Sequence, residues 1–166
     1  MISIRVCSMG TIEAHEEFGA QYMVSLLAHP FDAAELRPPW IDPARHHVFW
    51  FADLEDANLP EAPTREDIRR VVALGKELAG PGSEAAFLIH CAAGVSRSPA
   101  AAFIFFTIHL GPGSESDALH RTAQSAESPA VWPNALMIRY ADDLLGRQGA
   151  MIRALAEWEG RQFTVP

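Results

Sequence analysis

The sequence of 166 residues is poor in cysteine and has no long apolar run, and each shortage excludes a class of protein. The two cysteines, Cys7 and Cys91, lie too far apart in sequence to suggest the disulfide framework of a small secreted domain. No apolar run approaches the roughly 20 residues of a membrane-spanning helix. The first residues carry one positive charge, Arg5, and continue into a strand pattern, so we expect no secretory signal. These features predict a cytoplasmic protein without a membrane partner.

Positive charge is also scarce. Lys76 is the only lysine, and the formal net charge is −8 at pH 7. Proteins that bind nucleic acids or anionic surfaces use clustered Lys and Arg, so we expect no nucleic-acid partner. The seven histidines show no zinc-like spacing, and we expect no metal and no cofactor. No sequence feature indicates an oligomeric state.

The remaining composition, 49% apolar and 20% charged, is that of a folded domain, and we expect one domain over residues 1–166. Apolar periodicity predicts strands at 2–8, 22–28, 46–51 and 85–89. It predicts helices from the N-cap Thr64 to Gly80, over 98–110, and near 114–127, 134–146 and 149–160. Strands that alternate with helices predict an α/β domain with a mainly parallel central sheet flanked by helices.

The most informative segment is His90-Cys91-Ala92-Ala93-Gly94-Val95-Ser96-Arg97-Ser98. It follows a predicted buried strand and precedes a predicted helix that is apolar on nearly all sides. Anion sites in α/β folds lie at the carboxyl ends of strands, where loop amides and a helix N-terminus attract negative charge. The segment therefore predicts a site for one tetrahedral oxyanion. The same donors would favour the thiolate form of Cys91.

His90, Cys91, Gly94, Arg97 and Ser98 match the pattern HCxxGxxR(S/T), and the segment resembles the signature loop of the cysteine-dependent protein tyrosine phosphatases. Its Ser-Arg-Ser ending is more similar to the dual-specificity branch than to the tyrosine-specific branch. The resemblance covers about residues 46–140 and implies a phosphatase-type, three-layer Cys-x5-Arg domain. The loop residues expected to bind the substrate are His90, Ala92, Ala93, Gly94, Val95 and Ser96, with His90 orienting the loop.

An acidic loop after the third predicted strand extends the resemblance. The segment Asp53-Leu54-Glu55-Asp56-Ala57-Asn58-Leu59 is similar to the loop that carries the general acid of the family at its first aspartate. Asp53 is therefore the expected acid and Asp56 the alternative, while an ordinary turn or cap role remains open for both. Pro133-Asn134 resembles a Pro-Asn pair of the same branch, and we expect Asn134 to cap a helix or buttress a loop.

These residues imply a metal-independent phosphomonoesterase. Cys91 would attack phosphorus and form a phosphocysteine intermediate, while Arg97 would grip two phosphoryl oxygens in a bidentate fork. Asp53 would protonate the leaving group and then activate water. Ser98 would hydrogen-bond the sulfur, serve as an ordinary helix N-cap, or do both.

The loop side chains set expectations about the substrate. Ala92, Ala93 and Val95 are uncharged, whereas phosphoinositide phosphatases of this superfamily carry lysines there. A phosphorylated protein or a small phosphomonoester is therefore the expected partner. The segment 135–137 reads Ala-Leu-Met where the branch more often has a Gly-Phe pair, which leaves the preference between phosphotyrosine and phosphoserine or phosphothreonine open.

Two other functions compete with this reading. A catalytically weak module that binds phosphate or phosphoproteins would result if no acid reached the leaving group. A rhodanese-like sulfurtransferase is disfavoured, because those loops place the arginine closer to the cysteine.

Three further groups of residues lie outside the motif. We expect Cys7 to be a small core residue, with a redox partnership with Cys91 as the minor alternative. The Asp142-Asp143 pair is expected on a solvated helix face. The same holds for the acidic cluster Glu13, Glu16 and Glu17.

Overall fold

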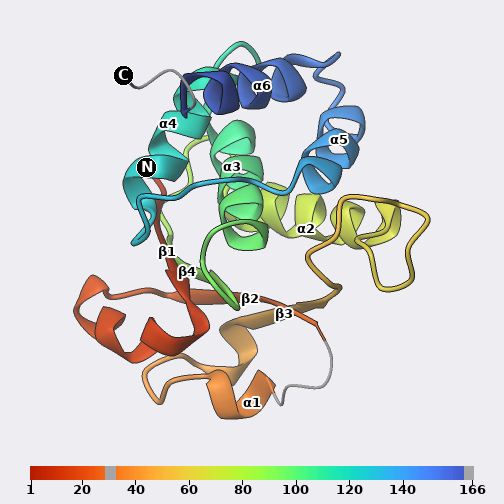
Figure 1. The fold of residues 1–166 in the computed structure, drawn as a ribbon. Helices are drawn as coiled ribbons and strands as arrows, with labels where there is room; N and C mark the ends of the chain where they lie inside the picture. The colour runs from red at the N-terminus through yellow and green to blue at the C-terminus, as the bar shows by residue number, and fades with distance from the viewer. Residues whose placement is uncertain (29–32, 163–166) are drawn as a thin grey trace.

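The computed structural model describes residues 1–28 and 33–162 (Figure 1). Its sheet has four strands: β1 (Ser3–Ser8), β2 (Tyr22–Leu27), β3 (His46–Trp50) and β4 (Ala86–Cys91). Their order across the sheet is β1-β4-β2-β3, and all three pairings are parallel. The predicted α/β class and parallel sheet are confirmed.

One face of the sheet is covered by a thick helical layer, which fills the upper half of Figure 1. Its helices are α2 (Arg65–Leu78), α3 (Arg97–Leu110), α4 (Glu115–Ser125), α5 (Ala135–Leu144) and α6 (Ala150–Gln162). The central helix is α3, in which every residue from 97 to 108 is buried. This burial explains why α3 has no polar face.

The other face carries a thinner layer of short elements, for which the sequence predicted only a solvated helix face at the acidic cluster Glu13, Glu16 and Glu17. The short elements are the 3-10 helix η1 (Met9–Phe18), the one-turn helix α1 (Ala33–Leu36) and the 3-10 turn η2 (Pro43–Arg45). A second apolar cluster lies on this side and is made of Cys7, Ile12, Ala20, Met23, Ile41 and Leu88. The three layers expected from the resemblance are therefore unequal in thickness.

The start of α2 follows from its sequence. Thr64 and Asp67 form a reciprocal capping box, in which the Asp67 amide donates to Thr64 Oγ1 at 3.1 Å and the Thr64 amide donates to Asp67 Oδ2 at 2.9 Å. This satisfies amides that a helix start leaves without partners. The predicted N-cap at Thr64 is confirmed, and the helix ends two residues before Gly80.

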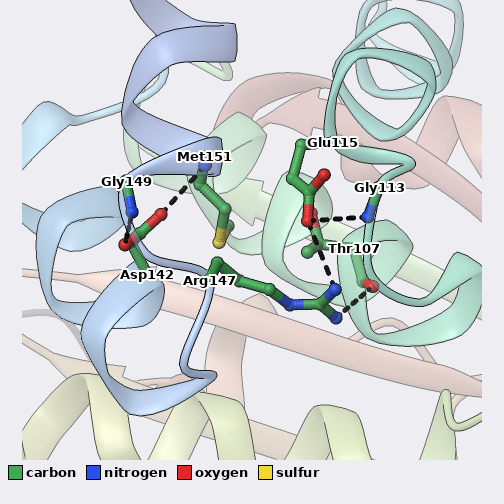
Figure 2. Close-up of polar contacts among 7 residues, drawn as sticks. All are labelled: Thr107, Gly113, Glu115, Asp142, Arg147, Gly149 and Met151. Atoms are coloured by element: carbon green, nitrogen blue, oxygen red, sulfur yellow. Dashed lines mark hydrogen bonds and ion pairs between the residues drawn. The ribbon is translucent and has the colours of Figure 1, made fainter.

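A buried ion pair ties the ends of three helices together (Figure 2). The Arg147 Nη1 atom lies 3.2 Å from Glu115 Oε1, and the two side chains are only 8% and 7% exposed. Arg147 also donates from Nη2 to the carbonyl of Thr107 at 3.0 Å. The loop before α6 is thereby fixed to the last turn of α3 and the first turn of α4.

Asp142 corrects one expectation. It is 5% exposed, and its carboxylate accepts hydrogen bonds from the amides of Gly149 at 2.6 Å and Met151 at 2.9 Å (Figure 2). The solvated position predicted for Asp142 is wrong, because its carboxylate satisfies amides at the start of α6. Its neighbour Asp143 is exposed and pairs with Arg65. The cluster Glu13, Glu16 and Glu17 is exposed on η1, as expected.

Within the described residues, none of the helices combines the length and the apolar character that a membrane crossing requires.

Candidate active site

The signature loop connects the end of β4 to the start of α3. Cys91 is the last residue of β4, and Arg97 is the first residue of α3, with Ser96 as the N-cap. The cysteine therefore stands at the carboxyl end of an inner strand of the sheet, as the sequence predicted. Its side chain is 2% exposed.

Two donors point at the cysteine sulfur. The amide of Gly94 donates to Sγ of Cys91 at 3.3 Å, and the hydroxyl of Ser98 donates to the same atom at 3.1 Å. Ser98 is fully buried within α3, so its alternative role as helix N-cap is wrong. Both donors favour negative charge on sulfur, because an ionised acceptor makes the stronger hydrogen bond.

Gly94 fits where no side chain could. Its φ angle is +73°, and a Cβ atom there would lie 2.7 Å from the carbonyl carbon of Cys7 and 2.8 Å from the amide nitrogen of Ser8. The end of β1 therefore supports the loop from below. A hydrogen bond of 3.2 Å from the Met9 amide to the carbonyl of Ala92 adds to this support.

Arg97 is buried at the start of α3, where it is 6% exposed. Its Nη1 atom donates to the carbonyl of Phe51 at 2.9 Å. Its Nε atom is buried and has no hydrogen-bond partner among the described residues. A buried guanidinium with an unused donor is costly unless an acceptor reaches it, and a phosphoryl oxygen is an acceptor of matching charge and geometry.

The acidic loop meets the signature loop at Asp53. Its Oδ1 atom accepts from the Ser96 hydroxyl at 2.7 Å and from Nδ2 of Asn134 at 2.9 Å. Asn134 is fully buried and also caps α5, because its Oδ1 atom accepts from the Met137 amide at 3.0 Å. Asn134 is thus both a helix cap and a loop buttress, which confirms the expectation.

Asp56 lies in a different environment. It is exposed, and its Oδ1 atom accepts from both the amide and the side chain of Asn58 at 2.9 Å. These hydrogen bonds lower the pKa of Asp56 below its usual value. Asp56 closes its own turn, whereas Asp53 contacts the signature loop. Of the two carboxylates, the geometry favours Asp53 as the candidate acid.

The remaining residues of the signature loop offer a substrate backbone groups and uncharged side chains. Ala92 and Ala93 are exposed, and Val95 is half-buried. The segment before α5 fixes the loop backbone, because the Trp132 amide donates to Val95 O at 2.9 Å and the Asn134 amide donates to Ser96 O at 3.3 Å. Ala92, Ala93 and Val95 therefore add no charge to the rim that a substrate would meet.

His90 faces away from solvent and connects to two residues that sequence reasoning missed. Its Nε2 atom lies 2.6 Å from the Ser25 hydroxyl, which in turn lies 2.7 Å from Nε2 of His46. Burial lowers the pKa of both histidines to about 4. The available signal was Ser25 itself, because it is the one serine in β2 and is flanked by apolar residues on both sides.

Cys7 belongs to the core, as expected. It is 1% exposed and packs in the apolar cluster on the η1 side of the sheet, whereas Cys91 packs in the cluster on the α3 side. Burial raises the pKa of Cys7 to about 12, so its thiol stays protonated. Its position on the opposite face and its protonated state both disfavour the redox partnership with Cys91.

No protein-family model matches the sequence, and no curated protein matches it significantly. Solved structures do match. Human DUSP28 has a TM-score of 0.61 at 16% identity, over 89% of this chain and 94% of that chain. The PTP-2 phosphatase of Cydia pomonella has a TM-score of 0.59 at 18% identity, over 87% and 84%. Human tyrosine phosphatase-like serine/threonine/tyrosine-interacting protein has a TM-score of 0.57 at 18% identity, over 87% and 88%. The chain therefore has the fold of the dual-specificity and tyrosine phosphatases.

Proposed function

We propose that this chain is a metal-independent phosphomonoesterase of the dual-specificity type that works through a phosphocysteine intermediate. The observation that carries the proposal is the pair of donors on Sγ of Cys91, from Gly94 and Ser98, beside the buried Arg97. A structural thiol needs neither the donors nor the guanidinium. A nucleophilic thiolate that faces a phosphoryl group needs both.

The first chemical step forms the phosphocysteine. Sγ of Cys91 attacks phosphorus, and the bond from phosphorus to the ester oxygen breaks. Arg97 and the loop amides hold the phosphoryl oxygens while charge spreads over them. Asp53 donates a proton to the departing oxygen. Because Ser96 and Asn134 anchor Oδ1, we expect Oδ2 to carry that proton.

The second step regenerates the thiolate of Cys91 and the protonated Asp53. Asp53, now ionised, takes a proton from a water molecule as the water oxygen attacks phosphorus. The phosphorus–sulfur bond breaks, and inorganic phosphate leaves. The Ser98 hydroxyl, 3.1 Å from Sγ, stabilises the thiolate as it departs.

The proposed substrates are phosphorylated proteins or small phosphomonoesters. The uncharged side chains of Ala92, Ala93 and Val95 provide no ion pairs for additional phosphates. A net charge of −8 further disfavours substrates that carry several phosphates.

The test measures hydrolysis of an aryl phosphate by the wild type, Cys91→Ser and the matched control Cys7→Ser. We expect Cys91→Ser to abolish turnover and Cys7→Ser to retain it. Acid-stable incorporation of labelled phosphate during turnover should also depend on Cys91. The Cys91→Ser variant then serves as a trap for phosphoproteins in a cell extract. Turnover that survives in Cys91→Ser would overturn the proposal, and phosphopeptide binding by a wild type without turnover would favour a binding module instead.

A further inference from the structure

A hydrogen-bonded chain of three side chains lies behind the candidate nucleophile. The Ser25 hydroxyl bridges Nε2 of His90 at 2.6 Å and Nε2 of His46 at 2.7 Å. Ser25 and His90 are fully buried, and His46 is half-buried at the start of β3. The three residues come from three neighbouring strands of the sheet, so parallel pairing brings them together.

The number of protons available to these three side chains restricts the tautomers of the two imidazole rings. A hydroxyl has one proton, so Ser25 donates to one imidazole and accepts from the other. Both rings are neutral at neutral pH, because burial lowers each pKa to about 4, with Arg37 and His47 adding to the effect on His46. The two histidines must therefore be opposite tautomers.

His90 precedes Cys91 at the end of β4, so the hydrogen bond that holds its ring also holds the strand end that carries the nucleophile. Nδ1 of His90 is buried and has no hydrogen-bond partner among the described residues. The Ser25 hydroxyl on Nε2 therefore fixes the orientation of this ring, and His46 fixes the orientation of the hydroxyl.

We propose that His46 is a positioning residue for the signature loop: through Ser25 it fixes the tautomer and ring orientation of His90, and thereby the backbone of Cys91. The inference extends the proposed function, on which it rests. His46 lies across two strands from Cys91, so it acts on the loop without contact with a substrate. The outer partners of a catalytic group commonly set its orientation in this way.

The tautomers are measured directly in the wild type. Long-range proton–nitrogen NMR spectra distinguish a proton on Nδ1 from one on Nε2. We expect one of His46 and His90 to carry its proton on Nδ1 and the other on Nε2 at pH 7. Two rings with the same tautomer would overturn the inference. This measurement requires no variant and no turnover.

A second test uses the reactivity of Cys91 toward iodoacetamide at pH 6. His46→Leu removes the hydrogen-bond partner of Ser25, and we expect alkylation to slow by about tenfold because the loop amides lose their alignment. The amide side chain of His46→Gln can both donate and accept a hydrogen bond, and it should restore most of the rate. The matched control is His47→Leu. His47 is on the same strand, but its ring centroid lies 6.3 Å from that of Tyr22, and it does not belong to the hydrogen-bonded series of His90, Ser25 and His46.

The outcomes separate the two proposals. A rate in His46→Leu equal to that in His47→Leu would overturn the positioning role, even if the wild type hydrolyses aryl phosphates. A specific effect of His46→Leu on alkylation, with no phosphatase activity in the wild type, would retain the positioning role and reject the proposed function. Thermal unfolding of each variant shows whether the fold is kept, and if His46→Leu does not fold, His46→Gln and the NMR experiment decide.

Discussion

The hydroxyl oxygen of Ser96 lies 2.7 Å from Oδ1 of Asp53, although 43 positions separate the two residues in the chain. Ser96 is the N-cap of α3, where a serine usually bonds to its own helix, yet its side chain makes no cap hydrogen bond. The hydroxyl instead fixes the acidic loop over the signature loop. Asn134 holds the same oxygen from α5 at 2.9 Å.

This arrangement predicts a leaving-group dependence for Asp53→Asn. The asparagine keeps an oxygen that Ser96 and Asn134 can bond, but it has no acidic proton. Turnover of an ester with a poor leaving group, such as phenyl phosphate, should fall by about 10²-fold or more. A nitrophenyl ester, whose leaving group needs little protonation, should lose much less. Steady-state rates on the two esters test this.

The matched control is Asp56→Asn, because in the described part of the chain the Asp56 carboxylate bonds to Asn58 within its own turn. Its rates should stay within about twofold of the wild type. Equal losses in the two variants would reject Asp53 as the acid.

Gly94→Ala tests the support of the signature loop by β1. A methyl group would be forced to within 2.8 Å of backbone atoms of Cys7 and Ser8, at a φ of +73°. Since backbone cannot move aside as a side chain can, we expect the loop to distort, with loss of nearly all turnover and about 2 kcal/mol or more of stability. Urea unfolding and aryl phosphate hydrolysis measure the two effects.

Gly82→Ala is the control for backbone strain. Gly82 has a φ of +83°, but no atom of residues 1–28 or 33–162 lies within 4 Å of the position that a Cβ atom would take. The variant should lose about 1 kcal/mol and keep its activity. Similar activity in both variants would show that the contact with β1 does not shape the site.

The sequence predicted those parts of the molecule whose signals are local. The apolar run of α3 indicated a central helix, and the spacing from Cys91 to Arg97 indicated an anion loop. Thr64 and Asn134 indicated helix starts, and both cap their helices. Each of these features depends on residues within a few positions of one another.

The missed features depend on contacts between distant segments. Ser25 and His46 meet because β2 and β3 pair in a register that periodicity does not reveal. The bounds and the 3-10 character of η1 were missed, because a 3-10 helix does not follow the period of 3.6 residues on which helix prediction relies. Asp142 looked like half of a solvated pair, and only the return of the chain at Gly149 gives its carboxylate a buried role.

The lowered histidine pKa values predict a loss of stability in mild acid. His46 and His90 have pKa values of about 4 in the folded protein, against the usual 6.5, which we take for the unfolded chain. Between these pH values the unfolded chain binds protons that the native protein does not bind, so the free energy of unfolding rises with pH across this window. The contribution of the two histidines to stability is complete above about pH 6.5 and is lost as the pH falls toward 4.

The measurement is the free energy of unfolding in urea at pH 6.5 and pH 4.5. Each of the two histidines should contribute a loss of about 2 kcal/mol between these values. His46→Gln cannot titrate and should show a smaller loss than the wild type. An identical pH dependence in this variant would mean that His46 is not held neutral.

The buried pair of Arg147 and Glu115 predicts a large and asymmetric stability effect (Figure 2). Arg147→Met would leave the carboxylate of Glu115 buried, with the Gly113 amide at 3.4 Å as its remaining donor. We expect a loss of about 3–5 kcal/mol, because the burial of an unpaired charge is strongly unfavourable.

The exposed pair of Arg65 and Asp143 is the comparison, and Arg65→Met should cost at most about 1 kcal/mol. The double variant Glu115→Gln with Arg147→Met removes both charges and should recover part of the loss. Urea unfolding at pH 7 measures all of these, and equal losses in Arg147→Met and Arg65→Met would mean that the buried pair does not hold the ends of α3, α4 and α6 together.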